Sequence, residues 1–225
     1  MNENYKWNGV TFNSKGIIIE DTPVMPKAKK RFTQYTIPGA NGFKTIDNKT
    51  YEAIPFTLKC HYKEGTGNRE QIGAWLDGYG KLQIDDEKEY TGYISNTIPF
   101  EKVVSFKKFP VQFMLQPIAK AVNATTINMT TPGTFQSDTY TNAYPIIKVT
   151  GTGNITIGLN GTQFTIYSAS GEYILDCEAK VITKNGFNES ANMSGDFPVV
   201  KNGSNQLTIT GSVTALTIEY KKSYL

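Results

Sequence analysis

Residues Asn154 to Tyr167, NITIGLNGTQFTIY, form the pattern that decides the fold of the C-terminal half of the chain. Asn160 and Gly161 tolerate the two positive φ angles of a type I′ turn, so the segment predicts two strands joined by a two-residue turn. This turn sets a register with three opposed pairs, Leu159 with Thr162, Ile157 with Phe164, and Ile155 with Ile166. One face of the hairpin is therefore apolar, and we expect a second sheet to cover it.

Short strands surround this hairpin in the sequence, with Gly- and Asn-bearing turns between them and no helical pattern. The expected strands are Tyr144–Val149, Glu172–Cys177, Lys180–Thr183, Gln206–Thr210 and Thr214–Lys221. The long polar segment Lys184–Asn205 is expected to be a surface loop. This spacing predicts a β-sandwich.

The N-terminal half predicts strands around one short helix. From Ile54 to Tyr62 apolar and polar side chains alternate, which is typical of a half-buried strand. A second strand has four apolar residues on one face, Phe109, Val111, Phe113 and Leu115. Pro110 predicts an edge position or a strand start, because proline cannot donate a ladder hydrogen bond.

The segment Asn68–Gly78 predicts the helix. Asn68 can cap its first turn, Gln71 has the capping-box spacing, and Gly78 suits a left-handed stop. Ile72, Trp75 and Leu76 form one apolar stripe, which we expect to pack on the sheet.

Composition limits the class of protein. The chain has 225 residues, 39% hydrophobic and 19% charged, which excludes a disordered chain. A net charge of +3, from 23 basic and 20 acidic residues, does not favour nucleic acid as the partner. The sequence contains no run of roughly 18 apolar residues that could span a bilayer. The first residues lack the apolar core of a signal peptide, so we expect synthesis in a reducing cytoplasm.

Composition also changes along the chain near residue 120. Most charged residues, both tryptophans, both arginines and the only histidine precede this point, and the remainder is rich in Thr, Asn and Gly. We place a boundary at 117–124 and expect domains of residues 1–120 and 121–225. Cys60 and Cys177 lie one in each domain, and we expect both to be free, buried thiols.

Residues able to perform catalysis are scarce. His61 is the only histidine, and its neighbour Cys60 should point to the opposite face of the strand. A serine that is distant in sequence could still approach His61. The acidic run Asp85–Glu89 lacks the glycine and ligand spacing of a calcium loop, and nothing places two of its carboxylates across a cleft. We expect a solvated turn there, and no catalytic residue, metal or cofactor.

One basic cluster stands out, formed by Lys27, Lys29, Lys30 and Arg31 after Pro23 and Pro26. It is expected to be a solvated loop. Its functional alternative is docking to an acidic patch on another protein, which would make assembly sensitive to salt.

Several stretches, taken in order, resemble the distal tail proteins of long, flexible-tailed bacteriophages. Those resembling the N-terminal domain of that family are Trp7–Phe12, Gly16–Ile19, Ile37–Gly42, Ala74–Leu82 and Phe109–Phe113. Those resembling its second domain are Asn142–Ile147, the Asn160–Gly161 hairpin, Leu175–Asp176, Gly195–Pro198 and Gly203–Leu207. Ala40 stands where the family suggests a charged residue, so a salt bridge from that loop is not expected.

The resemblance implies a mainly β fold: a ring-forming N-terminal domain, a β-barrel or sandwich with one short α-helix, and a galectin-like C-terminal β-sandwich. It implies a non-enzymatic hub at the virion tail tip, made in the bacterial cytoplasm. The expected partners are five further copies in a hexameric ring, the major tail tube protein, the tail-associated lysin or central tip protein, and a receptor-binding protein. Neither a membrane nor a specific DNA sequence is an expected partner. Gly39, Asn41 and Gly42 would shape an assembly loop.

Two other functions stay open. The first is a carbohydrate-binding module that recognises cell-wall polysaccharide through the second domain. That domain has no Trp, His or Arg, so stacking would fall to four tyrosines, Tyr140, Tyr144, Tyr167 and Tyr173. The second is a wall hydrolase, which the sequence supports poorly because it shows no acid/base pair and no activated nucleophile.

Overall fold

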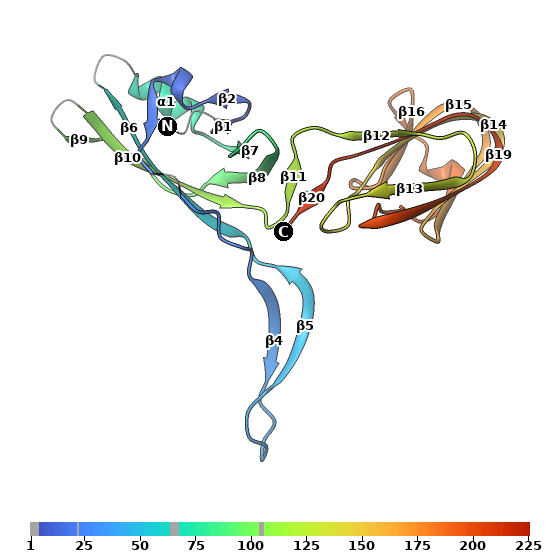
Figure 1. The fold of residues 1–225 in the computed structure, drawn as a ribbon, viewed down its shortest axis with the longest axis horizontal. Coiled ribbons are helices and arrows are strands. Elements are labelled where there is room, and N and C mark those ends of the chain that lie inside the picture. The colour runs from blue at the N-terminus through green and yellow to red at the C-terminus, as the bar shows by residue number, and fades with distance from the viewer. Residues whose placement is uncertain (1–4, 22, 64–67, 104–105) are drawn as a thin grey trace. The chain divides into compact units, whose positions relative to one another are not determined.

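The computed structural model describes residues 5–21, 23–63, 68–103 and 106–225. The chain divides into two compact units, one up to Ala119 together with Leu225, the other from Lys120 to Tyr224 (Figure 1). Nearly all the regular structure is β-strand, and the described residues contain one α-helix. Curled sheets give both units a sandwich-like form, so the predicted mainly β fold class is confirmed.

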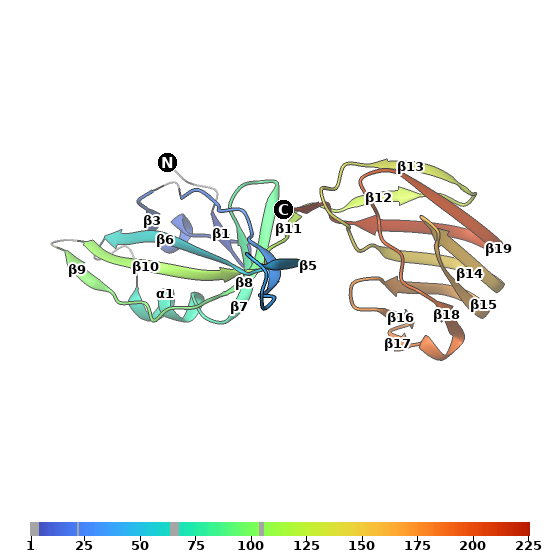
Figure 2. The same ribbon diagram turned by 90° about the horizontal axis from the view of Figure 1, so that it is seen from below.

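The first unit is built on one antiparallel sheet with the strand order β2-β1-β7-β8-β10-β6-β3 and with β9 paired to β10 (Figure 2). Its strands are β1 (Lys6–Trp7), β2 (Val10–Thr11), β3 (Ile17–Ile19), β6 (Ile54–Lys63), β7 (Tyr79–Gln83), β8 (Lys88–Ile94), β9 (Glu101–Val103) and β10 (Phe106–Leu115). A 3₁₀ turn (Asn13–Lys15) precedes β3. Two further strands, β4 (Lys30–Tyr35) and β5 (Lys44–Tyr51), pair with each other.

Alternating burial in β6 and β10 confirms the two strands predicted for this half. Val111 lies opposite Leu58, and Phe113 lies opposite Phe56. These side chains are buried in one core, where Trp7 contacts Phe113 with ring centroids 5.3 Å apart. The core sits on one face of the sheet, so the polar residues of both strands are turned to the other face.

Pro110 lies inside β10, so the expectation of a strand start was wrong. It falls between the segment of β10 that pairs with β9 and the segment that pairs with β8. Asn96 replaces the missing ladder there, because its Nδ2 donates to the Pro110 carbonyl (3.1 Å) and its Oδ1 accepts from the Gln112 N–H (2.8 Å). Pro110 thus occupies a local edge within a strand, where it leaves no ladder bond unmade.

The predicted helix is α1 (Arg69–Trp75). The Asn68 Oδ1 accepts from the N–H groups of Glu70 and Gln71, both at 3.0 Å, which satisfies two free donors of the first turn. Ile72 and Leu76 are buried, and the Trp75 ring meets Phe12 edge-on. The apolar stripe therefore packs on the core as expected.

The second unit contains one eight-stranded sheet with the order β12-β19-β14-β15-β16-β17, in which β13 also pairs with β19 and β18 with β15. Its strands are β12 (Thr125–Asn128), β13 (Gly133–Ser137), β14 (Ile146–Leu159), β15 (Thr162–Asp176), β16 (Val181–Lys184), β17 (Phe187–Asn188), β18 (Met193–Gly195) and β19 (Gly203–Tyr220). Near its ends, β11 (Ala119–Ala121) pairs with β20 (Ser223–Tyr224), and a 3₁₀ turn (Ser190–Asn192) precedes β18.

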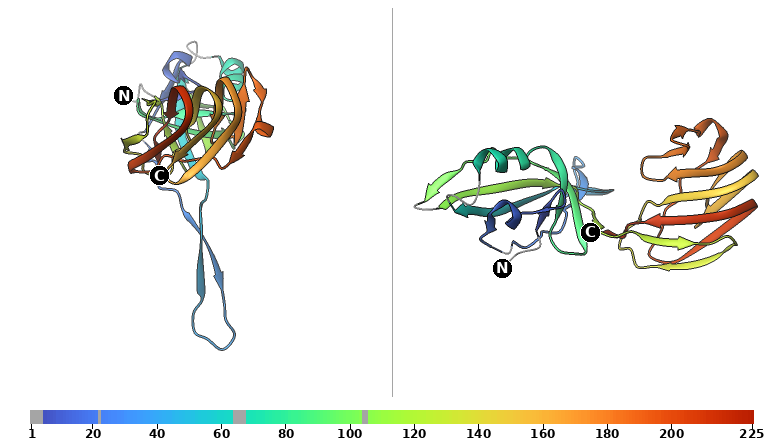
Figure 3. Two further views of the ribbon diagram at one scale, coloured as in Figure 1. Left: turned by 90° about the vertical axis from the view of Figure 1, so that its right-hand side faces the viewer. Right: turned by 90° about the horizontal axis from the view of Figure 1, so that it is seen from above.

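The hairpin register predicted around Asn160 and Gly161 is confirmed at all three opposed pairs. The strand expected at Lys180–Thr183 is confirmed as β16. The other four strands expected around the hairpin are not separate, because they are continuations of three long, bent strands, β14, β15 and β19 (Figure 3). Register shifts interrupt the ladders of β14 near Gly153, where the strands bend. A single curled sheet therefore covers the apolar face that we expected a second sheet to cover.

The segment from Lys184 to Asn205 was expected to be a loop, and that expectation was also wrong. It contains β17 and β18, and Val200 forms a bridge with Ala143. Both of these residues are fully buried in the core of the unit. The polar composition of the segment hides Val200, which anchors it in the core of the unit.

Asn160 and Asn205 form an amide network behind the hairpin turn. The Asn160 Nδ2 donates to the Asn205 Oδ1 (2.7 Å), and its Oδ1 accepts from the Gln206 N–H (3.1 Å). The Asn205 side chain is fully buried, and it accepts from the Lys201 N–H while donating to the carbonyls of Lys201 and Gly203. The network ties the turn to the start of β19.

Asn205→Ala should lower the free energy of unfolding by about 1–3 kcal/mol, because buried backbone groups lose their partners. Denaturant unfolding measures the change. The control is Asn202→Ala on the exposed side of the same segment, with an expected effect within about 0.5 kcal/mol. Equal stability of the two variants would contradict the role given to the network.

Candidate functional site

A two-stranded arm, residues 30–51, projects from the first unit (Figure 3). It consists of β4, β5 and the loop that joins them, and in the described part of the chain neither strand pairs with any other. An isolated two-stranded ribbon is at best marginally stable in water. The arm is thus the element with the least support from its own chain.

Apolar side chains lie on both faces of the arm. Phe32 is opposite Asp47, whereas Ile46 is opposite Thr33 on the other face, together with Tyr35. Phe32, Tyr35 and Ile46 are each about half exposed, at 53%, 52% and 54%, and Phe43 in the joining loop reaches 61%. Exposed apolar groups gathered on one element are typical of interaction sites.

Polar contacts fix the shape of the arm in place of a core. Lys30 Nζ is 2.5 Å from Asp47 Oδ2, and the other carboxylate oxygen of Asp47 accepts from the Lys49 N–H at 2.8 Å. The hydrogen bond from Lys30 is the main reason that the pKa of Asp47 lies below its usual value. Thr33 Oγ1 donates to Asn48 Oδ1 at 3.0 Å across the ribbon. These exposed contacts orient the strands and contribute little stability.

The tip of the arm holds the residues predicted to form an assembly loop. Ala40 N–H donates to the Ile37 carbonyl (3.1 Å), and Gly39 has a φ of +80°, which makes a Pro-Gly turn of type II. Gly42 also has a positive φ, +82°, and Asn41 between them is exposed. The loop shape therefore depends on two residues without a side chain.

The four basic residues expected in a solvated loop are not equivalent. Lys30 begins β4 and pairs with Asp47, and Lys29 lies 3.3 Å from Glu52. Lys27 and Arg31 are exposed, but Ala28 between them is buried. Residues 27–29 lie outside any strand, as expected, but Lys30 and Arg31 belong to β4, so the cluster forms the base of the arm.

His61 and Cys60 point to opposite faces of β6, as the alternation predicted. His61 Nδ1 lies 3.1 Å from Glu20 Oε1, and Lys108 Nζ lies 2.8 Å from the same oxygen. Cys60 is buried in the core, and burial raises the pKa of its thiol to about 12. The thiol therefore stays protonated and faces away from the imidazole that would have to act as its base, so the two residues do not form a nucleophilic pair.

Cys177 resembles Cys60 in the second unit. Both cysteines are free and buried, which confirms that prediction, and burial raises the pKa of the Cys177 thiol to about 12 as well. Two thiols of this kind serve as small apolar core groups.

The acidic run forms the turn between β7 and β8. Asp85 Oδ1 accepts from the N–H groups of Glu87 (2.9 Å) and Lys88 (2.7 Å), so Asp85 stabilises the turn itself. The residues that the structure describes contain no group of three His, Cys, Asp or Glu side chains able to hold a metal ion. Nor does any α-helix in these ranges have the length and apolar character of a membrane span.

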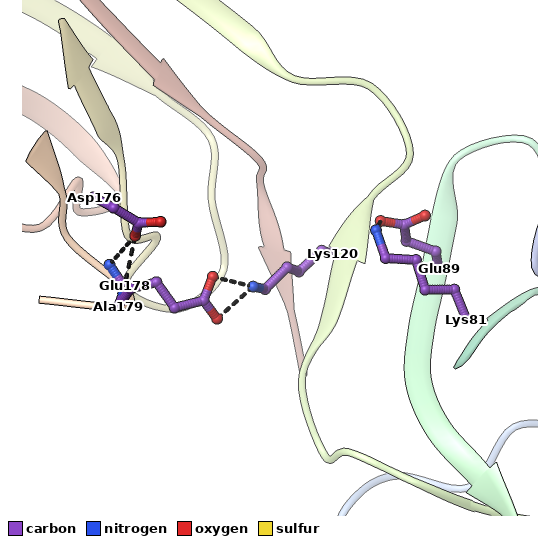
Figure 4. A network of polar contacts seen from close by, with 6 residues as sticks. All are labelled: Lys81, Glu89, Lys120, Asp176, Glu178 and Ala179. Atoms are coloured by element: carbon purple, nitrogen blue, oxygen red, sulfur yellow. Dashed lines mark hydrogen bonds and ion pairs between the residues drawn. The ribbon is translucent and has the colours of Figure 1, made fainter. Parts of the chain in front are cut away.

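The second unit contains an open cavity of about 140 Å³. Its wall includes Lys120, whose Nζ lies 2.5 Å from both carboxylate oxygens of Glu178, and Asp176, which accepts from two N–H groups of the next turn (Figure 4). Tyr144, half exposed, and Glu219 also line the cavity. An ion pair and an aromatic side chain thus line the same cavity.

Only some of the four tyrosines considered for sugar stacking are accessible. Tyr140, Tyr144 and Tyr167 are exposed, whereas Tyr173 is buried in the core and cannot stack on a ligand. Tyr140 already stacks on Tyr224, with ring centroids 5.4 Å apart, and the Tyr167 hydroxyl contacts Ser194 Oγ at 2.8 Å. Tyr144 alone among them lines the cavity.

The arm was not among the elements predicted from the sequence. The signal that could have revealed it is the aromatic and β-branched run Phe32–Ile37, followed by the turn dipeptide Pro38–Gly39. Apolar residues fall on both faces of the ribbon, so the alternation that identifies a half-buried strand is absent.

Comparisons with known proteins place the fold. No protein-family model matches the chain, and no curated protein matches it. The crystal structure of the SPP1 Dit protein (gp 19.1), described as a paradigm of the hub adsorption apparatus in phages that infect Gram-positive bacteria, is similar over 99% of each chain. Its TM-score is 0.74 at 14% identity. The baseplate of phage p2 in its activated conformation with Sr gives a TM-score of 0.49 at 6% identity, covering 97% of each chain. The likeness to SPP1 Dit confirms the resemblance to distal tail proteins at the level of the fold.

Gly39→Val should open the tip turn, because a β-branched residue at this positive φ costs about 1–2 kcal/mol. We expect exchange of the Ala40 amide hydrogen to become about tenfold faster by NMR, with the melting temperature unchanged. Gly39→Asn is the matched control, since asparagine tolerates this backbone conformation and should keep the slow exchange. Identical exchange in both variants would show that the turn does not depend on Gly39.

Proposed function

We propose that this chain is a distal tail protein, the structural hub at the tail tip of a long-tailed phage or prophage. Six copies form a ring that joins the tail tube to the tail-associated lysin or central tip protein. The proposal is supported by the whole-chain likeness to a hub protein and carried by one observation, the arm with apolar side chains on both faces.

Burial of the arm provides a driving force for assembly. Phe32, Tyr35, Phe43 and Ile46 each retain about half of their surface in water. Covering such a side chain gains roughly 1 kcal/mol, so the four contribute on the order of 4 kcal/mol per arm before the entropic cost of association. A ring repeats this gain at every interface and closes through contacts between two different patches of each copy.

The second unit supplies the other attachment surface in this proposal. Its core is independent of the core of the first unit, so it can carry a receptor-binding protein without disturbing the ring. In the virion, DNA passes through the lumen without being read by sequence. The function needs geometry and contact surfaces, and no bond is made or broken.

Replacing Phe43 and Ile46 by serine should abolish ring formation while the chain stays folded. Both side chains are exposed, so the melting temperature should hardly change, whereas the concentration needed for rings should rise at least tenfold. Light scattering after size exclusion and negative-stain microscopy measure the assembly. The matched control is Phe187→Ser, which removes an even more exposed aromatic residue from the second unit and should leave the rings intact. Rings of the double serine variant would rule out the arm as the assembly element.

A second candidate function, saccharide binding, is favoured by the cavity of the second unit. Its volume of about 140 Å³ is well below the roughly 300 Å³ of the smallest drug-sized pockets, which suits one sugar ring. Tyr144 offers an aromatic face to the apolar side of such a ring. The paired carboxylates, Glu178 with Lys120 and Glu219 with Lys148, keep lone pairs that accept hydroxyl donors.

Titration of the protein with host wall polysaccharide tests this second function. A saturable isotherm that weakens at least tenfold in Tyr144→Ala is expected, because stacking is lost. Tyr167→Ala is the matched control, since Tyr167 is equally exposed outside the cavity. Absence of binding, or an equal loss in both variants, would exclude the cavity as a saccharide site.

A further inference from the structure

The arm and the segments at its base differ in charge from the rest of the chain. Residues 27–52 contain six Lys or Arg and two Asp or Glu, a net charge of +4, which leaves −1 for the remainder of a chain whose total is +3. Two of the cations form ion pairs, Lys29 with Glu52 and Lys30 with Asp47. The exposed cations Arg31 and Lys49 lie near the base of the arm, and Lys44 lies opposite Tyr35 near the tip.

The outer face of the β7–β8 hairpin has the complementary pattern. Tyr79 and Tyr93 are directly opposed and are 64% and 47% exposed. Asp77 is exposed two residues before this pair, and the turn Asp85–Glu87 closes the other end of the hairpin. Lys81 and Glu89, which lie between the two ends, form a 2.8 Å ion pair, so the middle of the face is neutral.

Basic side chains are present beside the acidic turn as well. Lys6 Nζ lies 3.9 Å from Asp86, and Lys88 follows the turn directly. Asp85 is occupied in holding the turn, which leaves Asp86 and Glu87 as the exposed carboxylates of this end. The electrostatic attraction of this surface for a basic partner is therefore confined to the turn and depends on Asp86 and Glu87.

The two surfaces also match in length. Arg31 and Tyr35 are four residues apart on β4, and Tyr79 and Gln83 are four residues apart on β7, just before the acidic turn. A strand rises about 3.3 Å per residue, so both spacings are about 13 Å. Asp86 and Glu87 lie three and four residues beyond Gln83, so the long side chains of Arg31 and Lys49 at the base of the arm have to span the remaining distance when the aromatic residues near the tip meet the tyrosine pair.

We propose, on the basis of the ring function above, that the arm of one copy lies along the β7–β8 hairpin of a second copy. Tyr35 covers Tyr79 and Tyr93, with Lys44 near Asp77. Arg31 and Lys49 face Asp86 and Glu87 at the other end. The contact joins two different patches of the same chain, which is the kind of contact that closes a ring.

In this contact, charge determines which surface the arm binds more than it determines the affinity of binding. Exposed ion pairs stabilise a contact only weakly, whereas like charges brought together at an interface disfavour it strongly. Charge reversal on one side should therefore prevent association, and a matching reversal on the other side should restore it. Assembly of the natural chain should weaken as salt concentration rises.

Two charge-reversed variants, tested alone and mixed, test the contact. The arm variant carries Arg31→Glu and Lys49→Glu, and the hairpin variant carries Asp86→Lys and Glu87→Lys. Each alone should need at least tenfold more protein to form rings. Mixed in equal amounts they should form rings as readily as the natural chain, because each arm then meets an oppositely charged hairpin at every interface of an even-membered ring.

The control variant carries Glu172→Lys and Lys201→Glu, an exposed reversal in the second unit that should leave rings unchanged. Thermal unfolding verifies that all variants fold, and negative-stain microscopy counts rings. If the natural chain forms rings but the hairpin variant forms them equally well, or if mixing restores nothing, the arm docks elsewhere and this contact is wrong. If the arm variant alone fails while the hairpin variant assembles, the arm meets another acidic partner such as nucleic acid, which also overturns the contact. Absence of rings from the natural chain would overturn the ring function itself.

Discussion

The two-residue period of the β-strand governs both the core of this protein and its exposed surfaces. Wherever one face of a strand packs on a core, every second side chain is removed from water, as in β6 and β10. The same period separates Cys60, in the core, from His61, beside Glu20. Neither face of the arm packs on a core, and apolar side chains lie on both faces. The element that we propose for assembly is thus the one in which the alternating pattern has no core of its own chain to pack on.

Local rules predicted those parts of the fold in which a few neighbouring residues determine the backbone. The Asn160–Gly161 turn fixed its register, and Asn68 fixed the start of α1, because each signal acts within a few residues. The merging of short strands into β14, β15 and β19 was not predictable in this way. A bulge lets a strand bend and continue, and in sequence its glycine looks like a turn between strands. Of the candidate site, Gly39 and Gly42 were found from sequence, but the contact between Lys30 and Asp47 depends on pairing across 17 residues.

Asparagine side chains repeatedly replace backbone hydrogen bonds in this structure. Asn96 does so beside Pro110, Asn68 at the start of α1, and Asn205 behind the hairpin turn. Each offers both a donor and an acceptor at short reach, so it can satisfy an N–H and a carbonyl where the ladder stops. The abundance of asparagine in the sequence thus has a structural use in a protein made largely of strands, turns and strand ends.

Exposed apolar surface on an arm carries a risk, because two arms could bury it against each other and form a dead-end dimer. The charge of the arm opposes this outcome. Residues 27–52 carry +4, so two arms repel when they meet, while a surface of opposite charge attracts them. Pairing of like patches would give a closed two-fold dimer, whereas pairing of unlike patches leaves a free arm and a free receiving surface on every growing chain of copies. In the proposed ring, the excess of lysine and arginine therefore favours the contact that can continue until the ring closes, and the apolar side chains of the arm are the proposed source of most of its free energy.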